Sequence, residues 1–513
     1  MRTPYLTSPK AHPKAKPKRM LCLVGANDPK KWTHDEDGRW KVFEREGMAL
    51  QLRKVIAKDL YRVLREKLGA NWNSFISEKV TSVPGDITLE NLGVKDSNLV
   101  EEMWREVNIV VNVAATTNFD DRYDVSLSLN TMGAKHVFNF AKKCAKIMML
   151  LHVSTAYVSG ERAGLNLEKP FYMGETINGT LGLDIEMEKK IVAERLSELR
   201  GKETTEAEIT LTMKDLGIER ARKYGWPNTY VFTKAMGEML LGEMKENEMP
   251  IVILRPTIIT STYKEPFPGW IEGLRTVDSL IVGYGKGKLT FFPGDLECIL
   301  DLIPADMVVN SMVVAMAAHA NKPNCREMMI YQVGSSVSNP IKLEYIKDYS
   351  QSYFKKHPWI GRDGKPIKVG QVTLLTSMAT FHKYMAIRYL LPLKGLRAVN
   401  TTFCHYFHGM YVDLHRKIKF VMRMIELYQP YLFFKGVTLV LFDMLVLVLM
   451  FVDVHFIIAV HVGCGSGSVD GHGFAMVLQW LQFIIWFCNG SAHGFAGFWW
   501  THGFVDVLLK QPT

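Results

Sequence analysis

The chain lacks the patterns that mark several common classes of protein. Its seven cysteines are scattered, odd in number and without the close pairs of a zinc site, so reduced, buried thiols in a cytosol-facing protein are expected. The histidines near the C-terminal end also lack ligand spacing, and no metal site is predicted. No apolar signal peptide opens the chain, and no aromatic and basic residues interleave, so neither secretion nor nucleic-acid binding is expected.

Acidic residues are missing from the first 18 positions, where basic residues alternate with prolines. We predict a disordered basic tail at 1–18, which either contacts anionic lipid or serves as an organelle-targeting segment. The rest of the 513 residues are globular in composition, with 48% hydrophobic and 22% charged residues. That length is typical of two or three domains.

Apolar strands and amphipathic helices alternate along the first half of the chain. Strands are predicted at 19–24, 79–83, 107–113, 148–153 and 251–254, with helices at 47–68, 98–106 and 126–145. Residues 27–39 are predicted to be a polar loop. Strands separated by helices predict parallel βαβ units, and therefore an α/β fold with a doubly wound parallel sheet.

Small or polar residues stand where these strands end. Asp86 follows one strand, Ala114 and Ala115 follow the next, and Ser154 and Thr155 follow a third. Ligands of doubly wound sheets collect at this edge, where small residues let a flat cofactor approach and a hydroxyl can hold a carbonyl oxygen. The alternative for Ser154 and Thr155 is helix capping or turn chemistry.

A tyrosine and a lysine lie four residues apart in a predicted helix, at Tyr230 and Lys234. One helical turn places both side chains on the same face. A nearby cation favours the phenolate, so the phenol becomes a better proton donor to a carbonyl that accepts a hydride. The alternative is a chance pairing on an amphipathic helix.

Several passages together resemble one family. They are VPGDI at 83–87, VNVAATTNFD at 111–120, HVSTAYV at 152–158 and YGWPNTYVFTK at 224–234, and the likeness runs almost continuously from 47 to 436. In these the chain resembles the plant alcohol-forming fatty acyl-CoA reductases, which are extended short-chain dehydrogenase/reductases. The resemblance implies NADPH-dependent reduction of a long-chain acyl-CoA, through a bound aldehyde, to a primary alcohol for wax- or suberin-type lipids.

The resemblance also implies roles for individual residues. Tyr230 would donate the proton, Lys234 would bind the nicotinamide ribose and lower the tyrosine pKa, and Thr155 with Ser154 would orient the carbonyl. The remaining cofactor contacts would come from Asp86 and Ile87 beside the adenine, Ala114 and Ala115 along the dinucleotide, and Asn130, which would support the lysine through a water.

The family likeness further implies a domain plan and a location. The reductase domain would span 19–345, with substrate-binding portions near 160–224 and 257–339, followed by a helical domain at 346–436. We expect the cytosolic face of the endoplasmic reticulum membrane, or alternatively a plastid, with contact to the membrane surface. A homo- or heterodimer is possible within this plan.

Two regions depart from the family pattern. The family's glycine-rich turn, which holds the pyrophosphate on backbone N–H groups, has no counterpart here. Residues 23–26 resemble either a remnant of the first strand or part of the second, so we predict that the sheet misses its first strand. Residues 437–513 form an atypical apolar tail, which either associates with a membrane or is translated non-coding sequence that does not fold.

These departures leave alternatives to an active reductase. One is a catalytically impaired pseudo-reductase that acts as a partner of active subunits. Another is a dehydrogenase of a different substrate, such as a sterol or a sugar nucleotide, on the same scaffold.

Overall fold

The computed structural model describes residues 20–24, 54–160, 164–202, 204–244, 249–273, 276–320, 328–402, 406–433 and 436–438. The predicted tail at 1–18, the loop at 27–39 and the apolar tail beyond Thr438 lie outside these residues. Within the described ranges, none of the helices has both the length and the apolar character that crossing a membrane requires.

A four-stranded parallel sheet forms the centre of the protein. It consists of β3 (Ile109–Asn112), β4 (Met149–Val153), β6 (Ile251–Pro256) and β11 (Met328–Val333), in the order β11–β6–β4–β3. Every residue of β6 is buried. Nearly continuous apolar strands of this kind are typical of parallel sheets that are covered on both faces. The predicted α/β class and parallel sheet are confirmed.

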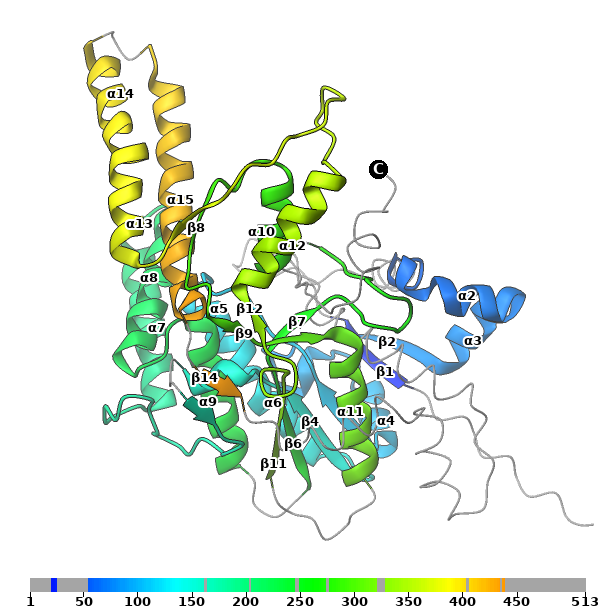
Figure 1. Cartoon of the computed structure of the whole chain (residues 1–513). Helices are drawn as coiled ribbons and strands as arrows, with labels where there is room; N and C mark the ends of the chain where they lie inside the picture. Colours follow the sequence, from blue (N-terminus) through cyan, green and yellow to red (C-terminus); the bar gives the residue numbers. More distant parts are fainter. Residues whose placement is uncertain are drawn as a thin grey trace, which may run out of the picture.

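Successive side chains of the sheet enter two different cores, because they point to opposite faces. Leu150, Ile251 and Ile253 pack with helices α4 (Ser97–Glu106) and α6 (Gly133–Lys142). Their neighbours Leu151 and Val252 pack on the other face with α11 (Ala305–His319). Helices therefore cover both faces, as Figure 1 shows.

A separate parallel pair, β1 (Met20–Val24) with β2 (Val80–Pro84), carries the N-terminal part of the sheet. In the doubly wound order the first strand of the fold would lie between β1 and β3. No strand in the described part of the chain joins the two sheets, and residues 109–111 of β3 are only half-buried. The prediction that the first strand is missing agrees with this arrangement.

Side-chain packing, and not a backbone ladder, connects the two sheets. Val83 and Leu92 belong to the same core as Phe138 of α6, and Leu92 lies in the short turn η4 (Glu90–Gly93). A ring nitrogen of His136 lies 3.0 Å from the carbonyl oxygen of Ile87. The β1–β2 pair therefore lies against α6.

The helix predicted at 47–68 is interrupted in the part that the structure describes, which begins at residue 54, and the short helix after it was not predicted. Residues 54–56 are helical, a 3-10 turn η2 (Asp59–Tyr61) follows, and then α2 (Arg62–Leu68), which ends before Gly69 as predicted. A second 3-10 turn, η3 (Gly69–Asn71), leads into α3 (Trp72–Lys79). Both helices pack around Tyr61 and Trp72, so tertiary burial stabilises these short elements.

The predicted helix at 126–145 is present with an interruption. It consists of α5 (Tyr123–Ser126), a π-helical segment η5 (Leu127–Met132) and α6. Three longer helices follow around a core that contains Trp226 and Phe232, namely α7 (Ile185–Gly201), α8 (Glu206–Lys223) and α9 (Thr229–Glu243).

Short strands extend the fold outside the main sheet. The pairs are β5 (Gly164–Asn166) with β14 (Gly436–Thr438), β7 (Ile258–Thr260) with β10 (Leu302–Pro304), β8 (Phe291–Pro293) with β13 (Thr373–Leu375), and β9 (Ile299–Leu300) with β12 (Ile341–Lys342). Their connections include the 3-10 turn η6 (Ala156–Ser159) and helix α10 (Thr276–Gly285).

The last helices of the described chain are α12 (Leu343–Lys356), α13 (Met378–Met385), the π-helical η7 (Ala386–Leu390), α14 (Leu391–Thr402) and α15 (His408–Leu432). Figure 1 shows α14 and the first half of α15 standing away from the body as a hairpin. The last turns of α15 return to the carboxyl edge of the main sheet.

Candidate active site

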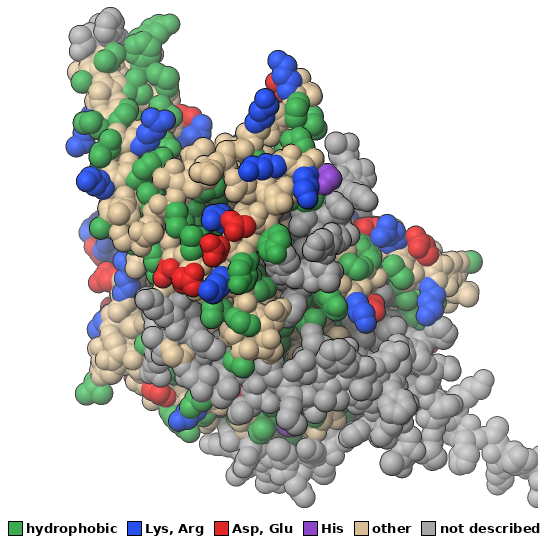
Figure 2. Space-filling model, in the orientation of Figure 1, with side chains coloured by type: hydrophobic (Ala, Val, Ile, Leu, Met, Phe, Trp, Pro, Cys, Tyr) green, Lys and Arg blue, Asp and Glu red, His purple; other side chains and the backbone are tan. Residues whose placement is uncertain are grey.

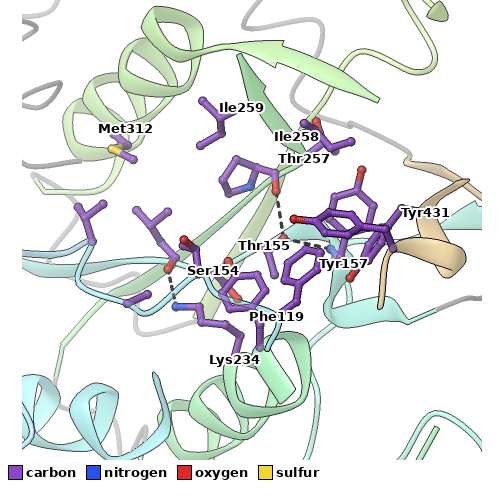
Figure 3. A pocket seen from close by; sticks show the side chains of 17 residues that line it. Phe119, Ser154, Thr155, Tyr157, Lys234, Thr257, Ile258, Ile259, Met312 and Tyr431 are labelled. Carbon is purple, nitrogen blue, oxygen red and sulfur yellow. Dashed lines mark hydrogen bonds between the residues drawn. The ribbon is translucent and has the colours of Figure 1, made fainter. Parts of the chain in front are cut away.

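A cavity of about 110 Å³ lies at the carboxyl ends of β3, β4 and β6 (Figure 3). Five of the predicted site residues line it, namely Ala115, Ser154, Thr155, Tyr230 and Lys234. The structure therefore brings together residues that are up to 119 positions apart in the chain, counted from Ala115 to Lys234.

Helix α9 presents Tyr230 and Lys234 to the cavity from the same face, as their spacing predicts. The helix begins at Asn228, whose side-chain oxygen accepts a hydrogen bond from the Val231 N–H at 3.2 Å. This cap fixes the first turn of the helix, and therefore the direction of the tyrosine.

The prediction that Lys234 lowers the pKa of Tyr230 is wrong for this arrangement. Burial raises the pKa of the Tyr230 phenol above its ordinary value, and the group that opposes this shift is the Thr155 hydroxyl, through a hydrogen bond. The lysine amine forms its hydrogen bond with the Val153 carbonyl instead. The phenol is consequently protonated at neutral pH, which is the state that a proton donor requires.

The Lys234 amine donates a hydrogen bond to the carbonyl oxygen of Val153 at 2.7 Å (Figure 3). It also lies 3.2 Å from Nε2 of His152. Burial lowers the pKa of Lys234 to about 8, although the carboxylate of Glu238 acts in the opposite direction. Glu238 is itself paired with Arg255 of β6 at 3.1 Å, and both side chains are only 1% exposed.

The neighbouring groups determine how His152 and Lys234 share their protons. The Ala114 N–H donates to Oδ1 of Asn112 at 3.3 Å, so the atom that faces Nδ1 of His152 at 3.0 Å is the Asn112 amide nitrogen, a donor. The proton of the neutral imidazole then lies on Nε2 and points at the lysine. Lys234 accepts this proton only as a neutral amine, and burial also lowers the pKa of His152 well below its usual value.

The two hydroxyls after β4 differ in their partners. The Thr155 hydroxyl accepts a hydrogen bond from the Tyr157 N–H at 3.3 Å, so the capping interpretation of this residue holds alongside its place in the cavity. The Ser154 hydroxyl is buried, lines the cavity and has no hydrogen-bond partner. A buried polar group without a partner costs about 1–3 kcal/mol, which a ligand atom in the cavity would recover.

Asn130 lies in the π-helical segment η5 and does not contact Lys234 directly. Its side chain accepts a hydrogen bond from the Thr116 N–H at 3.0 Å and donates to the Thr116 carbonyl at 3.2 Å and the Thr233 hydroxyl at 3.0 Å. The residue therefore fixes the loop that contains Ala114 and Ala115 against α9.

Asp86 and Ile87 follow β2 and do not line the cavity. The Asp86 carboxylate accepts hydrogen bonds from the backbone N–H and the hydroxyl of Thr88, both at 2.8 Å. Ile87 packs against Gly133, where an added Cβ would lie 2.7 Å from its Cδ1 atom. The two residues therefore lie with the β1–β2 pair, which no backbone ladder joins to the four-stranded sheet within the described residues.

The residues fit one end of a nicotinamide dinucleotide better than its middle. The cavity supplies the small Ala115 and the Lys234 amine, which suit a nicotinamide ribose, and leaves the Ser154 hydroxyl for the substrate carbonyl. The described residues contain no glycine-rich turn for the pyrophosphate, and the strand that would carry it is the one missing between β1 and β3.

Four aromatic residues that were not predicted as site residues cover the cavity. Phe119 stacks on Tyr230 with ring centroids 5.7 Å apart, and the rings of Tyr428 and Tyr431 lie 5.1 and 5.2 Å from Phe119. Tyr157 meets Tyr431 edge-on at 5.0 Å. The two tyrosines near the end of α15 could have been noticed in the sequence. Their neighbours in the chain do not show, however, that the end of α15 lies over β4.

Polar contacts hold the end of α15 in this position. The Tyr431 hydroxyl accepts a hydrogen bond from the Asn228 side chain at 2.9 Å, which connects the aromatic cover to the cap of α9. Two turns earlier, Arg423 pairs with Asp120 and with Asp215, each at 2.7 Å. The last helix is therefore part of the site.

Asp306, at the start of α11, stabilises a neighbouring loop. Its carboxylate accepts hydrogen bonds from the backbone N–H groups of Tyr263, Lys264 and Glu265 at 2.7–3.0 Å. These bonds hold the loop after β7.

Comparisons with known proteins agree with this geometry. Residues 45–312 match an NAD-binding family described as "Male sterility protein". The chain is 56% identical over 393 residues to an alcohol-forming fatty acyl-CoA reductase of Simmondsia chinensis, which covers 76% of this chain and 79% of that protein. It is 54% identical over 395 residues to fatty acyl-CoA reductase 1 of Arabidopsis thaliana, covering 77% and 79%.

Among solved structures, the terminal R domain from the myxalamid biosynthetic pathway matches with a TM-score of 0.40 and 16% identity. That match covers 92% of this chain and 85% of the R domain.

Proposed function

The chain belongs to the fatty acyl-CoA reductase family, and from this premise we propose that it reduces a long-chain acyl-CoA with NADPH, through a bound aldehyde, to a primary alcohol. Family membership supports a reductase with a nicotinamide cofactor and an acyl-CoA substrate. The choice of NADPH, the long or very long chain, the alcohol product and the use in wax- or suberin-type lipids belong to the proposal.

The site residues divide the work of this reaction. NADPH, when bound beside Lys234, would supply the hydride for the carbonyl carbon. Tyr230, which burial keeps protonated, donates its proton to the carbonyl oxygen, and Thr155 orients the phenol through their hydrogen bond. The unpartnered Ser154 hydroxyl donates to the same oxygen, so the carbonyl is held before the proton moves.

The aromatic cover explains how an aldehyde would stay on the protein between the two reductions. The rings of Phe119, Tyr157, Tyr428 and Tyr431 line the cavity and place apolar surface between the carbonyl and the solvent. Collapse of the first reduction product breaks the carbon–sulfur bond and releases CoA as its thiol, which leaves the aldehyde. A second NADPH would supply the second hydride, and Tyr230, after regaining a proton from water, would donate the second proton that gives the alcohol. The proposal is carried by one observation, the convergence of a half-buried tyrosine, Thr155 and an unpartnered hydroxyl on one cavity.

Acyl-CoA-dependent oxidation of NADPH, with product analysis by mass spectrometry, tests this proposal. Tyr230→Phe removes the proton donor and keeps the ring stack with Phe119, so we expect kcat to fall by roughly 10²–10⁴ with little change in NADPH affinity. Oxidation that proceeds equally well with a sterol or a sugar nucleotide would instead support a dehydrogenase on the same scaffold.

The interrupted sheet favours a second candidate, a catalytically impaired partner of active subunits. Loss of about three charge-assisted hydrogen bonds to the pyrophosphate, at about 1.5 kcal/mol each, would weaken the cofactor roughly a thousandfold. Titration of the purified chain with NADPH separates the candidates. Micromolar binding with turnover supports the reductase, whereas no binding, together with co-purification of an active relative as a heterodimer, supports the partner.

The cytosolic face of the endoplasmic reticulum membrane is the proposed location, with a plastid as the alternative. Long-chain acyl-CoA substrates partition into membranes, so a reductase at the membrane surface meets them at high local concentration. Fractionation of cells that express the tagged full chain tests the location.

A further inference from the structure

The outer hairpin, defined here as residues 386–402 and 406–421, packs mainly on itself. Along α15 the buried residues are Leu427 and Leu432, both in the last two turns, which belong to the body of the protein. Along α14 they are Leu393 and Asn400. Most side chains of the outer hairpin therefore face its surroundings.

Large apolar side chains are among the most exposed residues of this hairpin. Tyr406 at its free end is 83% exposed, Leu391 is 65% exposed and Phe420 is 63% exposed. Ile387, Met410 and Leu414 are also exposed. Exposed apolar residues that cluster on one projecting element indicate a binding surface for a protein or a membrane.

Basic residues accompany these apolar groups. Residues 378–422 contain seven Lys and Arg but a single acidic residue, Asp413, which pairs with Lys417 at 2.6 Å. Figure 2 shows blue Lys and Arg side chains interleaved with green apolar ones along the hairpin. Each Lys or Arg near an anionic bilayer strengthens binding about fivefold.

We propose that the outer hairpin docks on an anionic lipid bilayer. Apolar residues and a terminal tyrosine would enter the interface, while the long basic side chains extend to the head groups. A protein partner or a second copy of the chain, which itself carries a net charge of +10, offers this basic surface less charge complementarity. The inference deepens the proposed membrane location and does not depend on catalysis.

Hydrogen exchange of the full chain, with and without vesicles, tests the docking surface directly. The vesicles are phosphatidylcholine alone and phosphatidylcholine with phosphatidylserine. We expect slower exchange in peptides from 391–402 and 408–421 with the anionic vesicles only, and less of this protection at high salt. Peptides from the exposed helix α7 serve as the internal control.

Two hairpin variants complete the test. Lys394→Glu with Arg397→Glu reverses two charges, and Leu391→Ser with Phe420→Ser removes apolar contacts. Each is expected to weaken vesicle binding about tenfold or more. The matched control is Tyr172→Ser with Leu181→Ser, which removes equally exposed apolar groups elsewhere and should bind as the parent does.

Several outcomes would overturn the proposal. Vesicle binding without protection of the hairpin peptides would assign the membrane contact to another part of the chain. Hairpin variants that bind vesicles normally but lose self-association would assign the surface to a second copy. Reductase activity on dispersed acyl-CoA reports the proposed function separately and should persist in all variants.

Discussion

Replacement of Lys234 by methionine should change stability in a manner that depends on pH. The pKa of the buried amine is lowered from 10.5 to about 8, and this difference corresponds to about 3 kcal/mol of preference for the neutral amine. Between these pH values the unfolded chain binds more protons than the folded chain. The stability of the parent protein therefore rises as pH increases from 8 to 10.5, and below pH 8 the full penalty applies.

Lys234→Met removes both this penalty and the hydrogen bond to the Val153 carbonyl, which contributes about 1 kcal/mol at every pH. The variant should thus be more stable than the parent at pH 7, and the difference should shrink and reverse toward pH 10. Urea unfolding followed by tryptophan fluorescence measures both proteins across this range. The exposed Lys417→Met is the matched control.

A stability difference between Lys234→Met and the parent that stays constant from pH 7 to pH 10 would refute the reasoning. It would mean that the amine titrates near its ordinary pKa in the folded protein, and that the proton arrangement inferred from Asn112 and His152 is incorrect.

Two further changes test the packing around the site. Glu238→Gln leaves the buried charge of Arg255 without its partner and should lower the free energy of unfolding by about 3–5 kcal/mol in urea titrations. The control Asp413→Asn, at an exposed ion pair, should change the free energy of unfolding by less than about 0.5 kcal/mol. Equal losses in the two variants would contradict this reasoning. Tyr431→Ala opens the aromatic cover, so mass spectrometry should find more free aldehyde relative to alcohol, whereas Tyr431→Phe, which keeps the ring, should retain the parent ratio.

The parts of the site that local sequence encodes were predictable. The apolar run at 148–153 identifies β4, and the rule that ligands meet at strand ends then selects Ser154 and Thr155. The four-residue step between Tyr230 and Lys234 places both on one face of α9, because the helical period is fixed by the backbone.

The proton chemistry of the site was not predictable from the same residues. The direction of the Lys234 amine depends on the Val153 carbonyl and on the tautomer of His152, which are set by contacts between strands. Sequence spacing contains no information about which of two nearby acceptors a flexible side chain selects.

The aromatic cover was missed for a different reason. Phe119 and Tyr431 are more than 300 positions apart, and they meet only because α15 returns to the sheet edge after the hairpin. The short helix α3 was missed because its burial against Tyr61, and not its own periodicity, stabilises it. In both cases a long-range contact decides the structure.

Because the sheet is divided, the β1–β2 pair and the four-stranded sheet can open separately. A continuous ladder makes a sheet a single cooperative unit, but here β1 and β2 share a ladder only with each other. Local opening of that pair breaks none of the hydrogen bonds among β3, β4, β6 and β11. Warming should therefore loosen the edge that contains Asp86 before it displaces Tyr230 from the cavity.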